Sequence, residues 1–163
     1  MKSHFLLFVL TFFLASCSAI VKVDGHFPHI EQKNTQKEAY KIVLLPLVNY
    51  TDTPHAGSRA SNLIAGVLRA YGYSVTLKES SEFSQKALKK ARQEGATYLL
   101  HGGVSEWRYK TGIDGEAAVS LMLTLVDTQS GSVVWSATAS DTSWNNSSLG
   151  TVAQKLIEKM IVD

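Results

Sequence analysis

Residues 41–47 read KIVLLPL, a continuous apolar run that includes the β-branched Ile42 and Val43. Such a run is typical of a central strand that is buried on both faces of a sheet. Pro46 is expected to end the hydrogen-bonded ladder of this strand, because proline has no N–H to donate. The folded domain is therefore predicted to begin at about residue 39 with a buried strand.

Two helices and a short strand are expected after this run. Turn residues at 49–54 precede a helix whose apolar positions form one stripe and which Gly72 ends. Residues 74–77 predict a second strand, and residues 84–94 predict a second helix that Gly95 stops. The stripe of the first helix comprises Ala60, Leu63, Ile64, Val67, Leu68 and Tyr71.

The second half of the chain contains a predicted β-hairpin. Residues 119–126 alternate between Leu or Val and other side chains, which is typical of a strand that is buried more on one face. Residues 127–131, DTQSG, have the composition of a tight turn. The return strand is predicted over residues 133–140.

A further strand and a last helix flank this hairpin. The strand over 97–110 contains Gly102 and Gly103, which indicate a bulge or a bend. The last helix is expected after residues 145–148, NNSS, which supply capping side chains. The resulting order, β-α-β-α-β-β-β-α, predicts a single α+β domain over residues 39–163, with a mixed sheet and helices packed against it.

The N-terminal residues indicate export and lipid attachment. Lys2 is followed by the apolar run FLLFVLTFFL at 5–14 and then by Ala15, Ser16 and Cys17, the only cysteine of the chain. This order resembles the signal peptide of a bacterial lipoprotein over residues 1–16, with a diacylglycerol carried on the sulfur of Cys17. The run is too short to span a bilayer, which requires about 20 apolar residues. Because serine follows the cysteine, the expected location is the outer membrane of a Gram-negative cell.

Composition limits the remaining classes of function. Without residues 1–16 the chain keeps 147 of its 163 residues, and its formal net charge falls from +2 to +1 because Lys2 is the only charged residue removed. This size suits one domain with its own core. The near-neutral charge gives no support to nucleic-acid binding. A single cysteine excludes a disulfide within the chain.

Residues 17–38 are predicted to be a flexible tether between the lipid and the domain. Polar residues dominate and no apolar periodicity is visible. A coil of about 21 residues has an r.m.s. span of roughly 25 Å. His26 and His29 have no third ligand at suitable spacing, so no metal site is predicted. No cofactor is expected apart from the covalent lipid on Cys17.

The sequence contains no recognisable catalytic constellation. His55 and His101 lie in different elements, and no serine or cysteine stands in a nucleophile elbow. His101 is expected to be a core or interface histidine. Glu106, Asp114 and Glu116 are compatible with a glycosidase pair, in which two carboxylates flank a sugar, but acidic residues in a connection between strands more often face solvent. We therefore expect that the chain is not an enzyme.

Several segments resemble known families of periplasmic lipoproteins. Three of them resemble the curli-secretion and related assembly lipoproteins. Residues 106–116, EWRYKTGIDGE, resemble more specifically the PelC family, the outer-membrane lipoproteins of Pel exopolysaccharide export. Residues 54–60 and the Ser143-Trp144 region fit the same family. The three more general segments are residues 43–51, 98–104 and 127–135.

The PelC resemblance implies a non-enzymatic role in building the biofilm matrix. Members of the family form a dodecameric ring on the periplasmic face of the outer membrane, beside a β-barrel exporter. The ring acts as an electronegative funnel for a cationic, partly deacetylated amino-sugar polymer. Because the mature chain is slightly positive, the acidic surface must be local, and twelvefold repetition would strengthen its field. Asp114 and Glu116, which lie beside glycines, are the predicted polymer-guiding residues; an ordinary solvated loop is the alternative.

Trp144 is the predicted membrane-interface residue. It lies in a polar connection, DTSWNNSS, where no apolar stripe requires a buried indole. Tryptophan at such a position suits the bilayer interface, where the ring is in contact with lipid and the N–H stays hydrated. Trp107 and Trp135 fall within strand patterns and are expected to be packing residues.

Of two rival functions, one remains open from the sequence. A secretion channel like the curli exporter would need additional membrane strands of about 9–11 residues each, for which every connection is too short. A monomeric outer-membrane lipoprotein that activates a peptidoglycan synthase would have a similar fold. The size of the unlipidated domain in solution would separate a ring from a monomer.

Overall fold

The computed structural model describes residues 19–29, 40–110, 115–143 and 147–162. Three helices and seven strands lie within these residues. The strands are β1 (Ile20–Gly25), β2 (Lys41–Leu44), β3 (Val48–Asn49), β4 (Ser74–Leu77), β5 (Tyr98–Tyr109), β6 (Ala117–Asp127) and β7 (Val133–Ser143), and the helices are α2 (Ala56–Ala70), α3 (Gln85–Gln93) and α4 (Leu149–Val162).

All seven strands belong to one mixed sheet. Six of them follow the order β1-β7-β6-β5-β2-β4, and the short β3 pairs with β5. Strand β2 is parallel to both of its neighbours, whereas β5, β6, β7 and β1 pair antiparallel in succession. The predicted α+β class and the order of elements from residue 39 onward are confirmed, with β3 as an addition.

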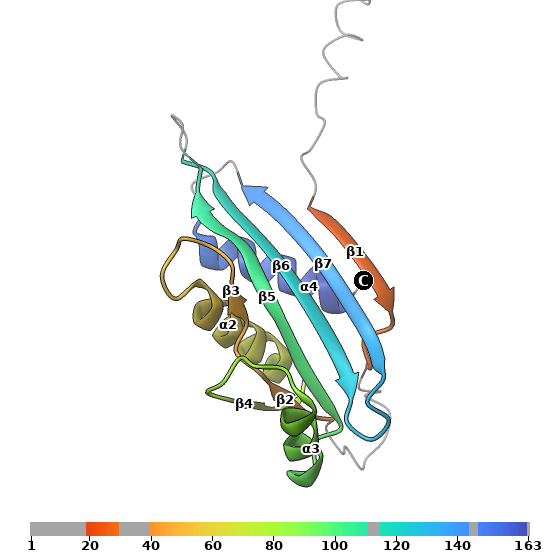
Figure 1. The fold of residues 1–163 in the computed structure, drawn as a ribbon. Helices are drawn as coiled ribbons and strands as arrows, with labels where there is room; N and C mark the ends of the chain where they lie inside the picture. Colours follow the sequence, from red (N-terminus) through yellow and green to blue (C-terminus); the bar gives the residue numbers. More distant parts are fainter. Residues whose placement is uncertain (1–18, 30–39, 111–114, 144–146, 163) are drawn as a thin grey trace, which may run out of the picture.

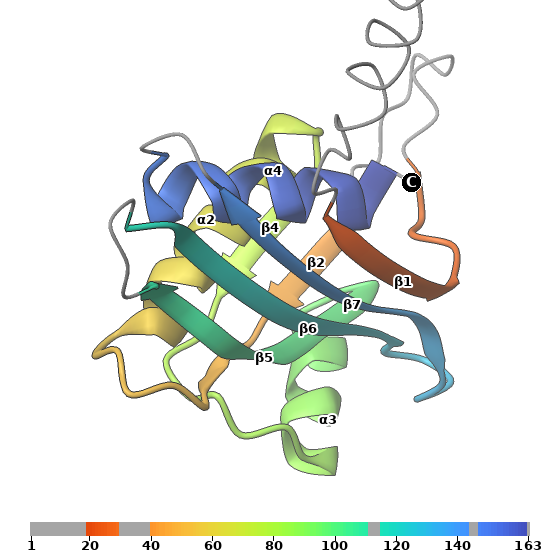
Figure 2. The ribbon, with the colours of Figure 1, turned by 90° about the horizontal axis from the view of Figure 1, so that it is seen from above.

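The helices cover the two faces of the sheet unequally. Helices α2 and α4 pack side by side on one face, and α3 lies on the other face at one end (Figures 1 and 2). Side chains alternate along a strand, so Ile42 and Leu44 face the main core under α2 and α4, whereas Val43 faces a smaller cluster under α3. Strand β2 is thus buried on both faces, as its apolar run predicted.

The face of β6 and β7 opposite α4 is polar and open. Met122, Thr138 and Ser140 are exposed there. The hydroxyl oxygens of Ser120 and Ser140 lie 2.7 Å apart across the two strands. No helix of the described residues is both long enough and apolar enough to cross a bilayer.

The predicted hairpin turn is confirmed. Asp127 Oδ1 accepts hydrogen bonds from the backbone N–H of Gln129 at 2.9 Å and of Ser130 at 2.7 Å. Gly131 has a φ of +76°, which glycine adopts without the steric cost of a Cβ. These bonds lower the pKa of the Asp127 carboxyl, with the backbone bond from Ser130 as the main cause.

The prediction of a tether over residues 17–38 is wrong for residues 20–28. Residues 20–25 form the edge strand β1, which pairs with β7 from Ile20 opposite Ser140 to Gly25 opposite Trp135. Phe27 follows this strand and is only 3% exposed. The segment is held by contacts with residues far away in the sequence, which local periodicity does not reveal.

Gly102 and Gly103 were predicted to mark a bulge or a bend, and the bulge is wrong for these two residues. The register shift in β5 lies between Val104 and Glu106 instead. The two glycines instead allow neighbouring groups to approach the backbone of β5 closely. A Cβ on Gly102 would lie 1.9 Å from the carbonyl oxygen of Met122, and a Cβ on Gly103 would lie 2.5 Å from the ring of Tyr50. A side chain at either position would displace its neighbour.

Candidate functional site

Three of the four predicted site residues, Cys17, Asp114 and Trp144, lie outside the described residues. Glu116 is described and directly precedes β6. The backbone N–H of Lys110 donates to the carbonyl of Glu116 at 2.7 Å, which closes the β5–β6 connection. The Nζ of Lys110 lies 4.0 Å from Glu116 Oε2, and the Glu116 side chain is 18% exposed. This carboxylate is therefore partly buried beside a cation.

The described residues that flank these positions gather at one end of the sheet. Tyr109, Ala117 and Ser143 are adjacent on β5, β6 and β7. Strand β1 begins at the same end, where Ile20 is paired with Ser140, and Figure 1 shows the start of β1 beside the end of β7. The sequence segments that carry the lipid, acidic and tryptophan predictions thus start from one end of the fold.

The backbone positions of Glu106 and Glu116 do not favour a glycosidase pair. Glu106 is paired with Ser120, four residues along β6 from Glu116. Four residues of a strand span about 13 Å, which exceeds the separation of about 5–9.5 Å between glycosidase carboxylates. Glu106 forms an ion pair with Arg108, with Oε1 and Nη2 3.0 Å apart. Asp114, the third candidate, lies outside the described residues.

His101 is a packed histidine on the α3 side of β5. Its ring stacks on Phe83, with ring centroids 4.1 Å apart and planes at 15°. Burial lowers the pKa of the His101 imidazole, because the charged form loses hydration. Among the described residues no group of three or more His, Cys, Asp or Glu side chains is arranged to hold a metal ion.

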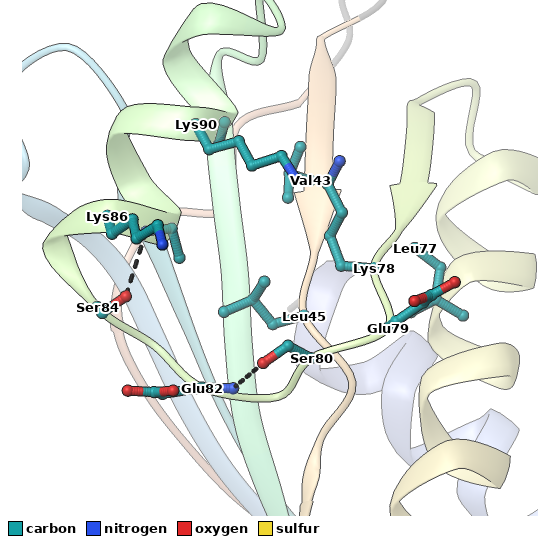
Figure 3. A pocket seen from close by; sticks show the side chains of 12 residues that line it. Val43, Leu45, Leu77, Lys78, Glu79, Ser80, Glu82, Ser84, Lys86 and Lys90 are labelled. Atoms are coloured by element: carbon teal, nitrogen blue, oxygen red, sulfur yellow. Dashed lines mark hydrogen bonds between the residues drawn. The ribbon is translucent and has the colours of Figure 1, made fainter.

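One surface hollow of about 560 Å³ lies between α3 and the connection that follows β4. Figure 3 shows Val43 and Leu45 among its apolar lining residues and Lys78 and Lys90 among its charged ones. Lys78 Nζ lies 2.6 Å from Glu94 Oε2, and this bond is the main cause that lowers the pKa of Glu94. The hollow combines apolar walls with charges of both signs.

A second hollow of about 390 Å³ lies where the chain after β3 meets the β5 bulge. Tyr50 and Asp52 line it from one side, and Glu106 and Arg108 line it from the other. Tyr50 is 64% exposed. Residues 49–54 were predicted only to form a turn. The signal for this hollow in the sequence is a tyrosine two positions before an aspartate within that turn.

The fold of this chain is similar to that of solved structures. A crystallised PelC dodecamer from Paraburkholderia phytofirmans is 38% identical, with a TM-score of 0.75; the match covers 88% of this chain and 95% of the other. The chain belongs to the PelC family. A single-substitution variant of the same P. phytofirmans protein, also a PelC dodecamer, gives 38% identity and a TM-score of 0.75 over 88% and 96% of the two chains.

More distant matches support the fold of this PelC-family chain. Lipoprotein GNA1162 from Neisseria meningitidis is 22% identical with a TM-score of 0.55, over 74% of this chain and 94% of the other. A family model described as peptidoglycan-synthase activator LpoB matches residues 72–140. A comparison with curated proteins gives no match.

Proposed function

We propose that this chain is a non-enzymatic outer-membrane lipoprotein that assembles into a periplasmic ring and guides a cationic exopolysaccharide, Pel, to its β-barrel exporter for the biofilm matrix. The similarity to PelC over 88% of the chain carries this proposal, because the similar protein is a dodecamer. The match covers 95% of the dodecamer's chain, so the two proteins share most of their fold.

Anchoring is proposed at Cys17. Ile20, which is paired with Ser140 in the sheet, is the third residue after Cys17. Three extended residues reach about 10 Å, so a lipid on Cys17 would hold the end of the sheet that includes Ser140 and Ser143 near the bilayer. Trp144 directly follows Ser143, which agrees with its proposed role at the membrane interface.

The polymer-guiding surface is proposed at Asp114 and Glu116. The mature chain has a formal net charge of +1, so attraction of a cationic polymer requires a local concentration of carboxylates. Repetition of these carboxylates around a ring would focus a negative potential in its opening. Lys110, 4.0 Å from Glu116, offsets part of the Glu116 charge in each copy.

The experiment that tests the ring is the size of the unlipidated protein in solution. The Cys17→Ser variant, measured by light scattering over a range of concentrations, is expected to form a closed oligomer. The same variant in cells is expected to lose its outer-membrane location and polymer export, since stable attachment requires acyl chains. A strictly monomeric protein, or full export without lipid, would overturn the proposal.

A monomeric activator of a peptidoglycan synthase is the second candidate. The match of residues 72–140 to the LpoB family model favours it. It predicts a monomer that stimulates glycan polymerisation by the purified synthase. The two functions are therefore separated by solution size together with this stimulation assay.

A further inference from the structure

The hollow beside Tyr50 has a rigid frame. Asn49 Oδ1 accepts from the backbone N–H of Thr51 at 3.0 Å, and Asn49 Nδ2 donates to the carbonyl of Thr53 at 2.9 Å. The hydroxyl of Thr53 donates to the carbonyl of Trp107 at 2.6 Å. The backbone N–H of Tyr50 donates to the carbonyl of Val104 at 2.9 Å. The loop is thus fastened to β5 at two points on either side of the bulge.

The aromatic ring of Tyr50 is held in place and remains accessible. One edge of the ring lies over the backbone of Gly103, where a Cβ would come within 2.5 Å of Cε2. The residue is nevertheless 64% exposed. An ordered, exposed tyrosine ring at the edge of a hollow offers a stacking surface for the apolar face of a ligand, or for a cation.

The charges that line the hollow leave one carboxylate available. Glu106 Oε1 accepts from Arg108 Nε at 3.1 Å and lies 3.0 Å from Arg108 Nη2, so these two charges neutralise each other. Asp52 also lines the hollow and is exposed, and among the described residues it takes part in none of the ion pairs. The hollow therefore has a local charge of one negative unit beside an aromatic ring.

The remaining lining groups favour a ligand rich in hydroxyl groups. Ser105 and Ser120 contribute hydroxyls, which both donate and accept, and the Glu106–Arg108 pair offers an acceptor and a donor side by side. A volume of about 390 Å³ lies within the range of small-molecule sites, about 300–1,000 Å³. An aliphatic ammonium alone would not use these groups, whereas an amino sugar would.

We propose that this hollow binds a protonated amino-sugar unit, with the sugar ring stacked on Tyr50 and its ammonium group beside Asp52. This inference rests on the proposed function, because it adds a discrete subsite for the polymer that the ring would guide. An acidic funnel attracts the polymer as a whole. The hollow would instead distinguish a sugar unit with a free amine from a sugar unit with an acetylated amine.

The test uses the full chain in detergent, at a pH where the amine is protonated. A glucosamine tetramer and its fully N-acetylated counterpart are titrated by calorimetry against the wild type, three variants of the hollow and one control variant. Asp52→Asn is expected to weaken binding of the amine tetramer about tenfold, as loss of a hydrogen bond to a charged group does, and to leave binding of the acetylated tetramer unchanged. Tyr50→Ala should weaken the binding of both tetramers, and Tyr50→Phe should weaken the binding of neither.

Asp24→Asn, which removes an exposed carboxylate on β1, is the matched control and should behave as the wild type. The proposal is overturned if Asp52→Asn keeps the preference for the amine, or if the wild type binds neither tetramer. It is also overturned if Tyr50→Ala changes the oligomer size, since Tyr50 would then belong to a contact between copies. Failure of the ring function appears instead in solution size and export, which are measured separately.

Discussion

The ring of Phe27 packs edge-on against the indole of Trp135, with centroids 4.9 Å apart and planes at 87°. Phe27 makes a second edge contact with Tyr73 at 5.6 Å. The hydroxyl of Tyr73 donates to the carbonyl of Pro28, and burial raises the pKa of Tyr73 to about 12. The segment that leads from the N-terminus into the domain is thus part of the core.

Phe27→Ala is expected to destabilise the domain by about 3–5 kcal/mol, the usual effect of removing a buried aromatic side chain. The free energy of unfolding from urea titration of the unlipidated chain measures this effect. His29→Ala, two positions away and exposed, is the matched control and should change stability little. Equal stability of the two variants would show that residues 20–28 are a tether after all.

Stability is expected to fall when the pH drops below about 6.5, the ordinary pKa of histidine, and His101 contributes to this fall. Its pKa is lowered in the fold by burial, so the unfolded chain takes up the proton first as the pH decreases. The stabilising contribution of the neutral ring is fully present above the unfolded pKa and is lost as the pH falls through the folded pKa. His101→Gln should reduce the difference between unfolding midpoints at pH 7.5 and pH 5.5, whereas the exposed His29→Gln should not.

Replacement of Asp114 by Asn and Glu116 by Gln is expected to reduce polymer export while the protein still folds. The substitutions keep the shape of both side chains and remove their charge. Loss of the Glu116 charge also leaves Lys110 without the carboxylate that lies 4.0 Å from it. Reversal of both residues to Lys should reduce export further, because a cationic polymer would be repelled.

The control for this experiment is Glu79→Gln with Glu82→Gln, which removes two carboxylates from the hollow beside α3. Secreted polymer and protein abundance are measured together, so that loss of protein is not mistaken for loss of guidance. Normal export by a folded double-lysine variant would contradict the role of Asp114 and Glu116.

Trp144→Ala is expected to leave the melting temperature nearly unchanged and to weaken association with lipid vesicles and polymer export. The reason is its polar sequence context and its position next to Ser143, at the end of the sheet where β1 begins. In a ring, the weak membrane insertion of each copy would combine into strong membrane binding through avidity. Tyr71→Ala, which removes an exposed aromatic residue after α2, is the control. If Trp144→Ala instead lowers the free energy of unfolding by about 3–5 kcal/mol, Trp144 is a core residue.

Elements with a strong local pattern could be predicted from the sequence. The apolar run at 41–47 predicted a strand that is buried on both faces, and the turn residues 127–131 predicted the β6–β7 hairpin. Strand β1 could not be predicted, because five of its six residues are exposed and its partner lies more than 100 positions away. An edge strand of this kind carries too few apolar residues to show a period.

The site was less predictable than the fold for a related reason. Gly102 and Gly103 suggested a bulge, but their absent side chains make room for the backbone at Met122 and for the ring of Tyr50. Likewise, Asp52 and Glu106 are 54 positions apart and line one hollow only because β3 pairs with β5. A single sequence reveals each of these residues but not the contacts that give them a role.

The pairing of all six residues of β1 with β7 has a mechanical consequence under the anchoring proposed at Cys17. A pull from the bilayer would reach the chain at Ile20 and act along the axis of β1. Ladder hydrogen bonds lie perpendicular to the strands, so such a load is shared among all of them in shear instead of opening them one after another. Phe27, buried beyond the far end of the strand, would have to leave the core before β1 could slide. Tension from the membrane would therefore be borne by the sheet itself.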